Sequence, residues 1–593
     1  MKKILFFLFT LLFLPISIYA SVSNNIYGIH LAQPQSQDLQ AAANLVNSNG
    51  GKWGYVTLVM QENDRNRDKW QNIFDEMREL HLIPIIRLAT QPEGENWRRP
   101  DPKDATDWVN FLDSLNWVVK NRYVILFNEP NHGSEWGGEV DEKSYAKVTL
   151  AFSKALKEKN KDFFVMLAGM DASAPSWMPG LEDEEVFFRK FLDESSKFLS
   201  RVNSSSDESS SSDTNSLKNS AVSSNGKLIT NHQSPVTSIF DYIDGLASHS
   251  YPNPDFAGSP YANGRGTVKT YDWELGLLAS LGAKKDLPVF ITETGWKRGS
   301  EQQVSYDFQT AFQSIWSQDP RVMAVTPFVL DYQGPPFLEF SWKKYQSDEF
   351  YQQYYAVQSL AKTAGDPDQI QKGSVNFNLP KELVAQSTYS FRVNLSNQGQ
   401  AVWDKDDGYQ LQITNDGLKS TESLVADVKD VKPFEEKTID FSLKTSQEEP
   451  KQTIRFVLTK DNQKIIESSP WQFRVLPLPD LNLNVNFWPF GKGQGNDFEV
   501  QLFDTDERLV FKNKGVKVTD GHGVIKNIQN IAIDEPYRAV ILKPGYLPRQ
   551  TYIIFKAQGN LAEFKAMLPF DFNRDGKFDF NDIVFLFKKL IGH

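Results

Sequence analysis

The sequence contains no cysteine among its 593 residues. This absence excludes disulfide bonds, thiolate zinc sites and cysteine nucleophiles. A basic excess is lacking as well, because 64 Lys and Arg stand against 75 Asp and Glu, for a formal net charge of −11. Proteins that bind nucleic acids present a basic face, so this balance argues against a nucleic-acid partner. It also argues against docking on an anionic membrane surface.

Long apolar runs are scarce, and the clearest one lies near the N-terminus. Lys2 and Lys3 precede an almost wholly apolar run over residues 4–14, and a small residue follows at Ala20. This order is typical of a prokaryotic-type secretory signal peptide, here residues 1–20. The run is much shorter than the roughly 20 residues that span a bilayer. We expect a secreted or cell-surface protein with no stable transmembrane span after signal cleavage; the alternative is an uncleaved N-terminal anchor.

Residues 25–365 alternate β-branched or aromatic runs with amphipathic helical stretches. The candidate strands are residues 26–31, 54–60, 83–89, 123–128, 163–169, 243–249, 288–292 and 323–330. Eight β-then-α units over this length predict a (β/α)8 TIM barrel. A doubly wound open sheet is the alternative, although no glycine-rich phosphate loop follows the first strand.

The remaining chain predicts a multidomain protein. A Ser-rich stretch within the fifth unit, residues 202–226, cannot bury apolar surface and is predicted to be a disordered insertion. After residue 365 short strands alternate with turns. Residues 372–477 resemble an Ig-like β-sandwich with Trp403 and Trp471 in its core, and residues 480–568 predict a second β-sandwich-type accessory module.

Two glutamates follow apolar strands of the predicted barrel. The fourth strand runs into VILFNEPNHG, which contains Asn128 and Glu129, and the seventh runs into PVFITETGWK, which contains Glu293. TIM-barrel enzymes carry their chemistry at the C-terminal ends of the strands. Two carboxylates that face each other across a cleft are what glycosidic bond cleavage needs, since one must donate a proton while the other is ionised.

Asn-Glu-Pro after strand four and Thr-Glu-Thr-Gly-Trp after strand seven resemble the clan A retaining β-glycoside hydrolases. The resemblance covers residues 25–365 and implies that Glu129 is the acid/base, that Glu293 is the nucleophile and that Asn128 bonds the sugar 2-hydroxyl. We therefore expect a glycoside hydrolase that cleaves a poly- or oligosaccharide by double displacement, without a catalytic cofactor. The alternatives are a non-catalytic glycan-binding or cell-surface scaffold and a transglycosylase that uses the same carboxylates.

Further candidate substrate-binding residues lie near the ends of other strands. Arg87 ends an apolar run, where a charge needs a partner such as Glu293 or Glu129, or forms a structural ion pair within the barrel. His30, His249 and Tyr251 follow strands one and six. Indole faces stack on sugar rings, so tryptophans after strands are candidate platforms. These are Trp97, Trp136, Trp296 and Trp342, with Tyr332 as a second aromatic after strand eight.

The C-terminal segment, residues 569–593, contains the spacing of a calcium loop. The run DFNRDGKFDFND places oxygen donors at loop positions 1, 3, 5, 7, 9 and 12, and Gly576 at the sharp turn. The donors are Asp571, Asn573, Asp575, the Lys577 carbonyl, Asp579 and Asp582. With the helix that follows, the loop resembles one half of a dockerin. The resemblance implies a structural Ca²⁺ and a cohesin-like or cell-surface partner; the alternative is a calcium-stapled cap on the preceding β module.

Overall fold

The computed structural model describes residues 25–208, 238–415 and 425–591. The chain divides into two compact units, Met1–Ile370 and Gln371–His593. The predicted signal peptide and residues 209–226 of the predicted insertion lie outside the described residues. Among the described residues, no helix is both long and apolar enough to cross a membrane.

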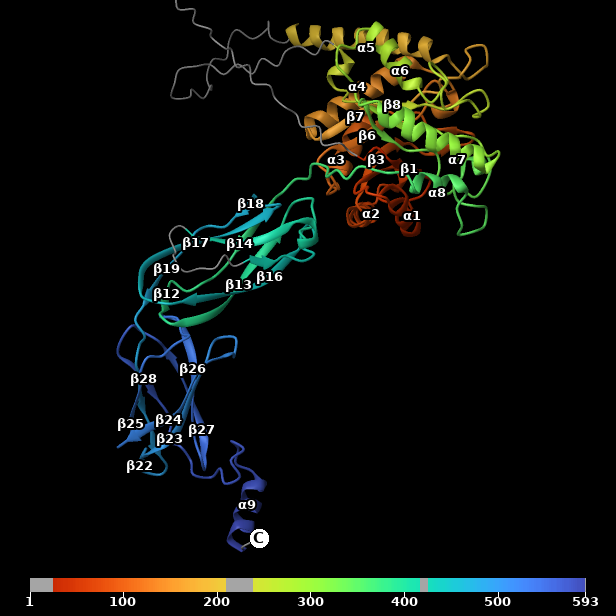
Figure 1. The fold of residues 1–593 in the computed structure, drawn as a ribbon. Coiled ribbons are helices and arrows are strands. Elements are labelled where there is room, and N and C mark those ends of the chain that lie inside the picture. The colour runs from red at the N-terminus through yellow and green to blue at the C-terminus, as the bar shows by residue number, and fades with distance from the viewer. Residues whose placement is uncertain (1–24, 209–237, 416–424, 592–593) are drawn as a thin grey trace, which may run out of the picture. The chain divides into compact units, whose positions relative to one another are not determined.

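The first unit is an eight-stranded parallel barrel (Figure 1). Five strands pair in the order β1-β2-β3-β6-β7 and three in the order β8-β9-β10, and isolated parallel bridges at Met166–Gly245 and Tyr27–Val325 join the two groups into a ring. All eight predicted strands are present. They are β1 (Gly28–Leu31), β2 (Gly54–Gln61), β3 (Leu82–Ala89), β6 (Arg122–Leu126), β7 (Phe163–Leu167), β8 (Leu246–His249), β9 (Val289–Glu293) and β10 (Val322–Val325).

One helix follows each barrel strand, and the apolar face of each helix packs on the barrel. In α2, the side chain of Asn66 caps the first turn by accepting from Lys69 N, and Trp70, Phe74 and Met77 are buried at helical spacing. The helices are α1 (Ser36–Val46), α2 (Arg67–Glu79), α3 (Ala105–Asp113), α4 (Glu142–Lys159), α5 (Glu184–Glu208), α6 (Thr270–Ser280), α7 (Glu301–Thr310) and α8 (Gln352–Gln358). A small hairpin, β4 (Pro92–Glu93) and β5 (Asn96–Trp97), lies after β3.

Helix α5 corrects one boundary of the predicted insertion. Residues 202–208 continue this helix and are not the beginning of a disordered segment. The Ser/Asp composition of these residues suggested disorder. However, α5 is already anchored upstream by the buried side chains of Phe187, Phe188 and Phe191, and an anchored helix can extend further through backbone hydrogen bonds.

Aromatic side chains fill the interior of the barrel. Tyr55 on β2, Tyr123 on β6, Phe164 on β7 and Phe290 on β9 contact one another with ring centroids 5.1–6.3 Å apart. Such pairs contribute about 0.5–1.5 kcal/mol each beyond their buried area. Because the cluster closes the interior, the chemistry of the barrel is confined to the strand ends above it.

The second unit begins with a two-sheet sandwich over residues 373–476. One sheet has the order β11-β13-β16 and the other β12-β19-β17-β14-β15, with β18 paired to β17. Trp403 and Trp471 lie in the shared core, as predicted. The strands are β11 (Gly373–Asn376), β12 (Glu382–Val384), β13 (Ser387–Asn397), β14 (Tyr409–Asn415), β15 (Val425–Asp427), β16 (Glu436–Thr445), β17 (Glu449–Lys460), β18 (Gln463–Glu467) and β19 (Trp471–Leu476).

The next module, predicted as a second β-sandwich-type module, is rich in β-structure and has one hydrophobic core. Its main sheet has seven strands in the order β27-β26-β23-β24-β25-β20-β28, and β21 and β22 form a separate two-stranded sheet. Strand β20 pairs antiparallel with β25 and parallel with β28. The strands are β20 (Leu481–Asn484), β21 (Asn486–Phe487), β22 (Gly491–Lys492), β23 (Gly495–Phe503), β24 (Leu509–Thr519), β25 (His522–Ile525), β26 (Pro536–Lys543), β27 (Tyr546–Ile554) and β28 (Asn560–Glu563); helix α9 (Phe580–Ile591) ends the described chain.

Candidate active site

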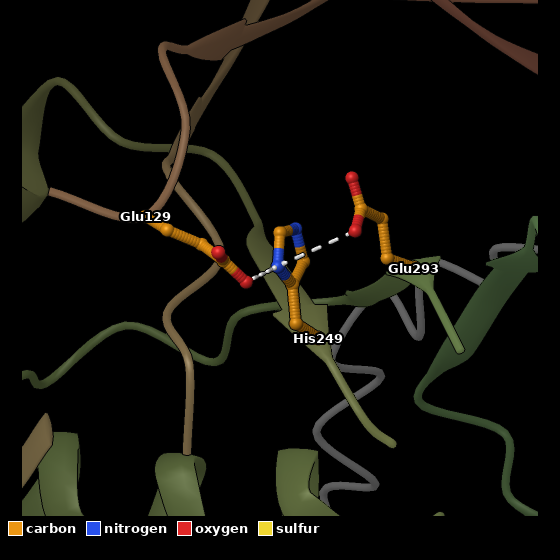
Figure 2. Close-up of side chains that lie close together, drawn as sticks. All are labelled: Glu129, His249 and Glu293. Carbon is orange, nitrogen blue, oxygen red and sulfur yellow. Dashed lines mark hydrogen bonds and ion pairs between the residues drawn. The ribbon is translucent and has the colours of Figure 1, made fainter. Parts of the chain in front are cut away.

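Two glutamates face each other at the C-terminal end of the barrel. Glu293 is the last residue of β9, and Glu129 lies in the loop that follows β6. His249, the last residue of β8, stands between them (Figure 2). Its Nδ1 lies 2.7 Å from Glu129 Oε1 and 3.8 Å from Glu293 Oε2. The three polar atoms all lie within 4.8 Å of one another.

The distance between the two carboxyl groups bears on which glycosidase mechanism the site suits. Carboxyl groups about 5–5.5 Å apart suit a retaining glycosidase, whereas inverting enzymes need roughly 6.5–9.5 Å to admit a water molecule. One oxygen of Glu129 and one oxygen of Glu293 lie within 4.8 Å of each other, a close approach that is compatible with the retaining arrangement.

Unusual backbone geometry aims Glu129 into the site. Phe127 and Glu129 have positive φ angles of 71° and 28°, a region that side-chain-bearing residues rarely adopt. The Glu129 N–H donates to the carbonyl of Gly169 at 3.2 Å, which fixes the turn after β6. Gly169 is also required by close approach, since a Cβ there would lie 2.2 Å from Cδ2 of His249.

Glu293 is buried and held in its ionised form. Arg87 Nη1 lies 2.5 Å from Glu293 Oε1, and the Tyr251 hydroxyl donates to Oε2 at 3.1 Å. Burial raises the pKa of Glu293, but the charges of His249 and Arg87 outweigh it and lower that pKa to about 2. An ionised carboxylate at neutral pH is what a nucleophile needs.

The two histidines near Glu293 differ in charge. Burial and the charge of Arg87 lower the pKa of His30 to about 3, so His30 is neutral, and its ring nitrogens have no hydrogen-bond partner among the described residues. For His249, burial would lower the pKa, but Glu293 and Glu129 outweigh burial and raise it. The two carboxylates therefore favour the protonated form of His249, whereas burial and Arg87 favour the neutral form of His30.

A cavity of about 740 Å³ opens over these residues. The structure brings together seven of the residues predicted from the sequence. They are His30, Arg87, Asn128, Glu129, His249, Tyr251 and Glu293. Trp97 and Tyr332 also line the cavity, together with Phe256, Phe328, Phe337 and Phe340. This aromatic rim gives a sugar ring apolar faces to stack on.

The prediction that a sugar stacks on the tryptophans after the strands is wrong for three of them. Trp136, Trp296 and Trp342 are at most 4% exposed and do not line the cavity. Trp136 packs edge-on against Phe127 and Tyr145, with ring centroids 5.9 and 5.3 Å away. The other two both pack on one phenylalanine of α7, and the Trp296 indole donates to the Gly258 carbonyl. These indoles stabilise the loops of the site and cannot stack on a sugar.

Sequence reasoning missed three polar residues of the cavity. His132 Nε2 lies 2.8 Å from Asp171 Oδ2, and both side chains line the cavity beside Glu129. Glu135, also in the loop after β6, lines the same cavity as Asn128. Burial and the charge of Glu129, opposed by Arg87, raise the pKa of Glu135 to about 7. The sequence feature that could have identified all three as site residues is their position after barrel strands four and five.

The same carboxylates have to be considered as metal ligands. Among the described residues, Glu129, His249 and Glu293 form the one group of three such side chains whose ligand atoms lie within 4.8 Å of one another. The Arg87 guanidinium on Glu293 already supplies positive charge there. A further cation would be repelled, so the group is better suited to acid–base chemistry than to metal binding.

The C-terminal loop has some features of a cation site. Asp571 is 5% exposed, and its Oδ1 has no hydrogen-bond partner among the described residues. Gly576 has a φ of 83°, as the sharp turn of a calcium loop requires. Asp582 instead accepts from the backbone N–H groups of Phe572 and Asn573 at 2.8 and 3.1 Å.

No protein-family model and no curated protein matches this sequence. Solved structures that match include a glucosidase from Croceicoccus marinus, at 10% identity over 88% of this chain and 96% of that chain, with a TM-score of 0.36. A triple variant of an endo-β-1,4-glucanase from Xanthomonas axonopodis pv. citri matches at 10% identity. The match covers 56% of this chain and 98% of that chain, with a TM-score of 0.34. A β-mannanase from Thermomonospora fusca matches at 12% identity over 57% of this chain and 92% of that chain, with a TM-score of 0.32. These TM-scores are too low to assign function, which must come from the site itself.

Proposed function

We propose that the chain is a retaining β-glycoside hydrolase that cleaves a poly- or oligosaccharide. The carboxylate pair of Glu129 and Glu293 carries the proposal, since its oxygens lie within 4.8 Å at the mouth of a barrel and open into a cavity. The cavity volume of about 740 Å³ favours a catalytic role over a scaffold that has only kept the fold.

The geometry supports a double displacement. Glu293 attacks the anomeric carbon as the glycosidic bond breaks, and Glu129 gives its proton to the departing oxygen. Because His249 Nδ1 occupies one oxygen of Glu129, the proton is delivered from the other oxygen. Glu129 then takes a proton from water, the water oxygen attacks the anomeric carbon, and Glu293 leaves as a carboxylate.

Several groups would hold the sugar during these steps. Arg87 and Tyr251 orient Glu293 through hydrogen bonds to its two oxygens. Neither ring nitrogen of His30 has a hydrogen-bond partner among the described residues, so a sugar hydroxyl would satisfy one of them. The amide of Asn128 is held by Arg87, whose Nη1 donates to Asn128 Oδ1 at 2.6 Å. The reaction needs no cofactor beyond these side chains.

The two carboxylates have different roles, and an experiment can separate them. Purified protein is screened on a panel of β-glycans and aryl β-glycosides, beside Glu129→Ala, Glu293→Ala and the loop control Glu139→Gln. Glu293→Ala should lose activity on every substrate. Glu129→Ala should lose about 10²–10⁴-fold on glycans but far less on an aryl glycoside whose leaving group needs no proton.

Full activity in Glu293→Ala would refute the proposal. So would an equal loss in the exposed control Glu139→Gln, because that side chain is outside the cavity. Product analysis distinguishes hydrolysis from transfer to a second sugar, since a transglycosylase would release longer oligosaccharides and little free reducing sugar.

We further propose that the C-terminal loop binds a structural Ca²⁺. Oδ1 of Asp571 is buried and has no hydrogen-bond partner within the part of the chain that the structure describes. This oxygen and the turn at Gly576 support a hard cation at this position. The bound ion would neutralise the loop carboxylates and stabilise α9. Calorimetric titration of the full chain with CaCl₂ tests this, with Asp571→Ala as the variant that should not bind. A cohesin-like or cell-surface partner for this repeat stays a prediction.

Export is proposed on the N-terminal pattern alone. The basic pair, the apolar run and the small residue near Ala20 fit cleavage by a signal peptidase. N-terminal sequencing of protein recovered from the medium should begin at or next to Ser21. Protein that stays in the membrane fraction with Met1 intact would contradict cleavage.

A further inference from the structure

A histidine of the cavity has no task in the displacement mechanism. His132 lies three residues after Glu129 and directly precedes the 3₁₀ turn η3 (Gly133–Glu135). Its backbone N–H donates to the Glu129 carbonyl at 2.8 Å, and its side chain lines the cavity and is 23% exposed. The position of this imidazole beside the proposed acid/base therefore needs a separate explanation.

Asp171 determines which nitrogen of the His132 ring is left for a ligand. Nε2 of His132 lies 2.8 Å from Asp171 Oδ2, and the Ser173 N–H donates to Asp171 Oδ1 at 2.8 Å. Burial raises the pKa of Asp171, but the hydrogen bonds from His132 and Ser173 outweigh burial and lower that pKa. An ionised carboxylate only accepts, so Nε2 carries the hydrogen of this bond. Within the described part of the chain, Nδ1 of His132 has no hydrogen-bond partner, so Nδ1 is the nitrogen that remains for a ligand.

The bond between His132 and Asp171 is not needed to join the loops after β6 and β7. Asn131 is fully buried, and its Nδ2 donates to the carbonyls of Asp171 and Glu182 at 2.9 and 3.1 Å. The Oδ1 of Asn131 accepts from the Asp171 N–H at 3.2 Å. Because Asn131 already fastens the two loops, the ring of His132 is explained better by a role in binding than by a role in stapling.

The imidazole belongs to a hydrogen-bonded wall on one side of the cavity. Beyond Asp171, the Ser173 hydroxyl accepts from Nδ2 of Asn253 at 2.7 Å, and Asn253 also lines the cavity. The wall consequently runs from the loop after β6, through the loop after β7, to the loop after β8. A polar wall that is already formed can orient the hydroxyl groups of a sugar.

The strand order places this wall on the side of the acid/base. In the ring of eight strands, β7 pairs with β6, the strand that precedes Glu129, whereas β8 separates β7 from β9, which carries Glu293. Strand β7 also stands opposite β1, which carries His30. In the proposed mechanism Glu129 gives its proton to the departing oxygen, so the sugar on this side is the leaving group.

We propose that Nδ1 of His132 hydrogen-bonds a hydroxyl group of the leaving-group sugar, so that the site prefers a saccharide to a non-sugar leaving group. This inference rests on the proposed glycosidase function and adds a specificity-determining residue to it. The alternative is that the imidazole only supports its loop and never touches substrate.

Two substitutions of His132 separate the two ring nitrogens. In His132→Gln, the amide nitrogen can stand near the position of Nε2 and still donate to Asp171, but no atom replaces Nδ1. In His132→Asn, a polar atom stands near the position of Nδ1, and the bond to Asp171 is lost. Glu139→Gln, an exposed change in the same loop, is the control.

The full-length proteins are compared on an oligosaccharide of the best-cleaved sugar and on the aryl β-glycoside that shares its non-leaving part. His132→Gln should lower kcat/KM about 10-fold on the oligosaccharide, the effect of one lost hydrogen bond, and less than about 2-fold on the aryl glycoside. His132→Asn should lose less than His132→Gln on the oligosaccharide. Glu139→Gln should match wild type on both substrates.

Oligosaccharides that lack one hydroxyl of the leaving-group sugar identify the group that is bound. The ratio of kcat/KM between wild type and His132→Gln should fall to about 1 for one deoxy analogue and stay near 10 for the others. The same ratio for every analogue would overturn the contact, since a purely structural role affects all of them alike.

Equal losses on the oligosaccharide and the aryl glycoside would also overturn the inference, as would full activity of His132→Gln on the oligosaccharide. A wild type that cleaves the aryl glycoside but no oligosaccharide overturns this inference and leaves the proposed hydrolase in place. A wild type that cleaves neither substrate contradicts the proposed function itself. Thermal melting of each variant identifies any loss that comes from unfolding.

Discussion

Glu135→Gln should stabilise the barrel at alkaline pH and leave it unchanged at acid pH. The pKa of Glu135 rises from 4.5 to about 7 on folding, chiefly through burial. The folded protein therefore holds this proton more tightly than the unfolded chain, and its stability falls as the pH rises from about 4.5 to about 7. At 1.36 kcal/mol per pKa unit, the cost above pH 7 is about 3 kcal/mol. A glutamine does not titrate, so the variant avoids this cost.

Differential scanning calorimetry of the full chain measures the effect, because it resolves the barrel transition from those of the β modules. At pH 8 the barrel of Glu135→Gln should melt several degrees above wild type, and at pH 4.5 the two should coincide. Glu139→Gln, an exposed change in the same loop, should show no such pH dependence. If the difference in melting temperature between Glu135→Gln and wild type is the same at both pH values, it arises from packing and not from the ionisation of Glu135.

Three other changes test the site and its supports. Arg87→Met removes the cation beside Glu293, so the pKa of Glu293 should rise above its value of about 2. The acid limb of the pH profile of kcat/KM should then move to higher pH. An acid limb that does not move would mean that the ion pair with Arg87 is not what lowers the pKa of Glu293. Trp136→Ala deletes a fully buried indole and should destabilise the barrel by about 3–5 kcal/mol in calorimetry, whereas a small loss would mean that the loop re-packs. A chelator should lower the melting temperature of the C-terminal segment in wild type and have no effect on Asp571→Ala; identical responses would argue against Ca²⁺ at the loop.

The barrel could be predicted because its strands are short apolar runs that alternate with helices of clear period. Once eight such units are assumed, the fold itself brings the strand ends to one rim, so Glu129, Glu293, Arg87 and His249 could be grouped from the sequence. Their mutual distances could not be predicted. These depend on the positive φ angles around Asn128 and on the lack of a side chain at Gly169, neither of which a strand pattern encodes.

The errors concern loops. Trp136 and Trp296 follow strands, as a sugar platform would, but their loops fold back so that the indoles pack against helices α4 and α7. Glu135 was overlooked for the converse reason. It lies nine residues after β6 in a polar stretch that reads as exposed, and only the 3₁₀ turn η3 returns it to the cavity. Loop conformation is set by tertiary contacts, so composition alone could not place these side chains.

Covalent trapping of the glycosyl-enzyme intermediate identifies the nucleophile. Wild-type protein is incubated with an activated 2-deoxy-2-fluoro-β-glycoside of a sugar that it cleaves, and its intact mass and proteolytic peptides are measured. We expect one glycosyl adduct per chain, carried by Glu293, with loss of activity in step with labelling. An adduct on Glu129, or turnover of the parent glycoside by protein that never accumulates an adduct, would contradict it.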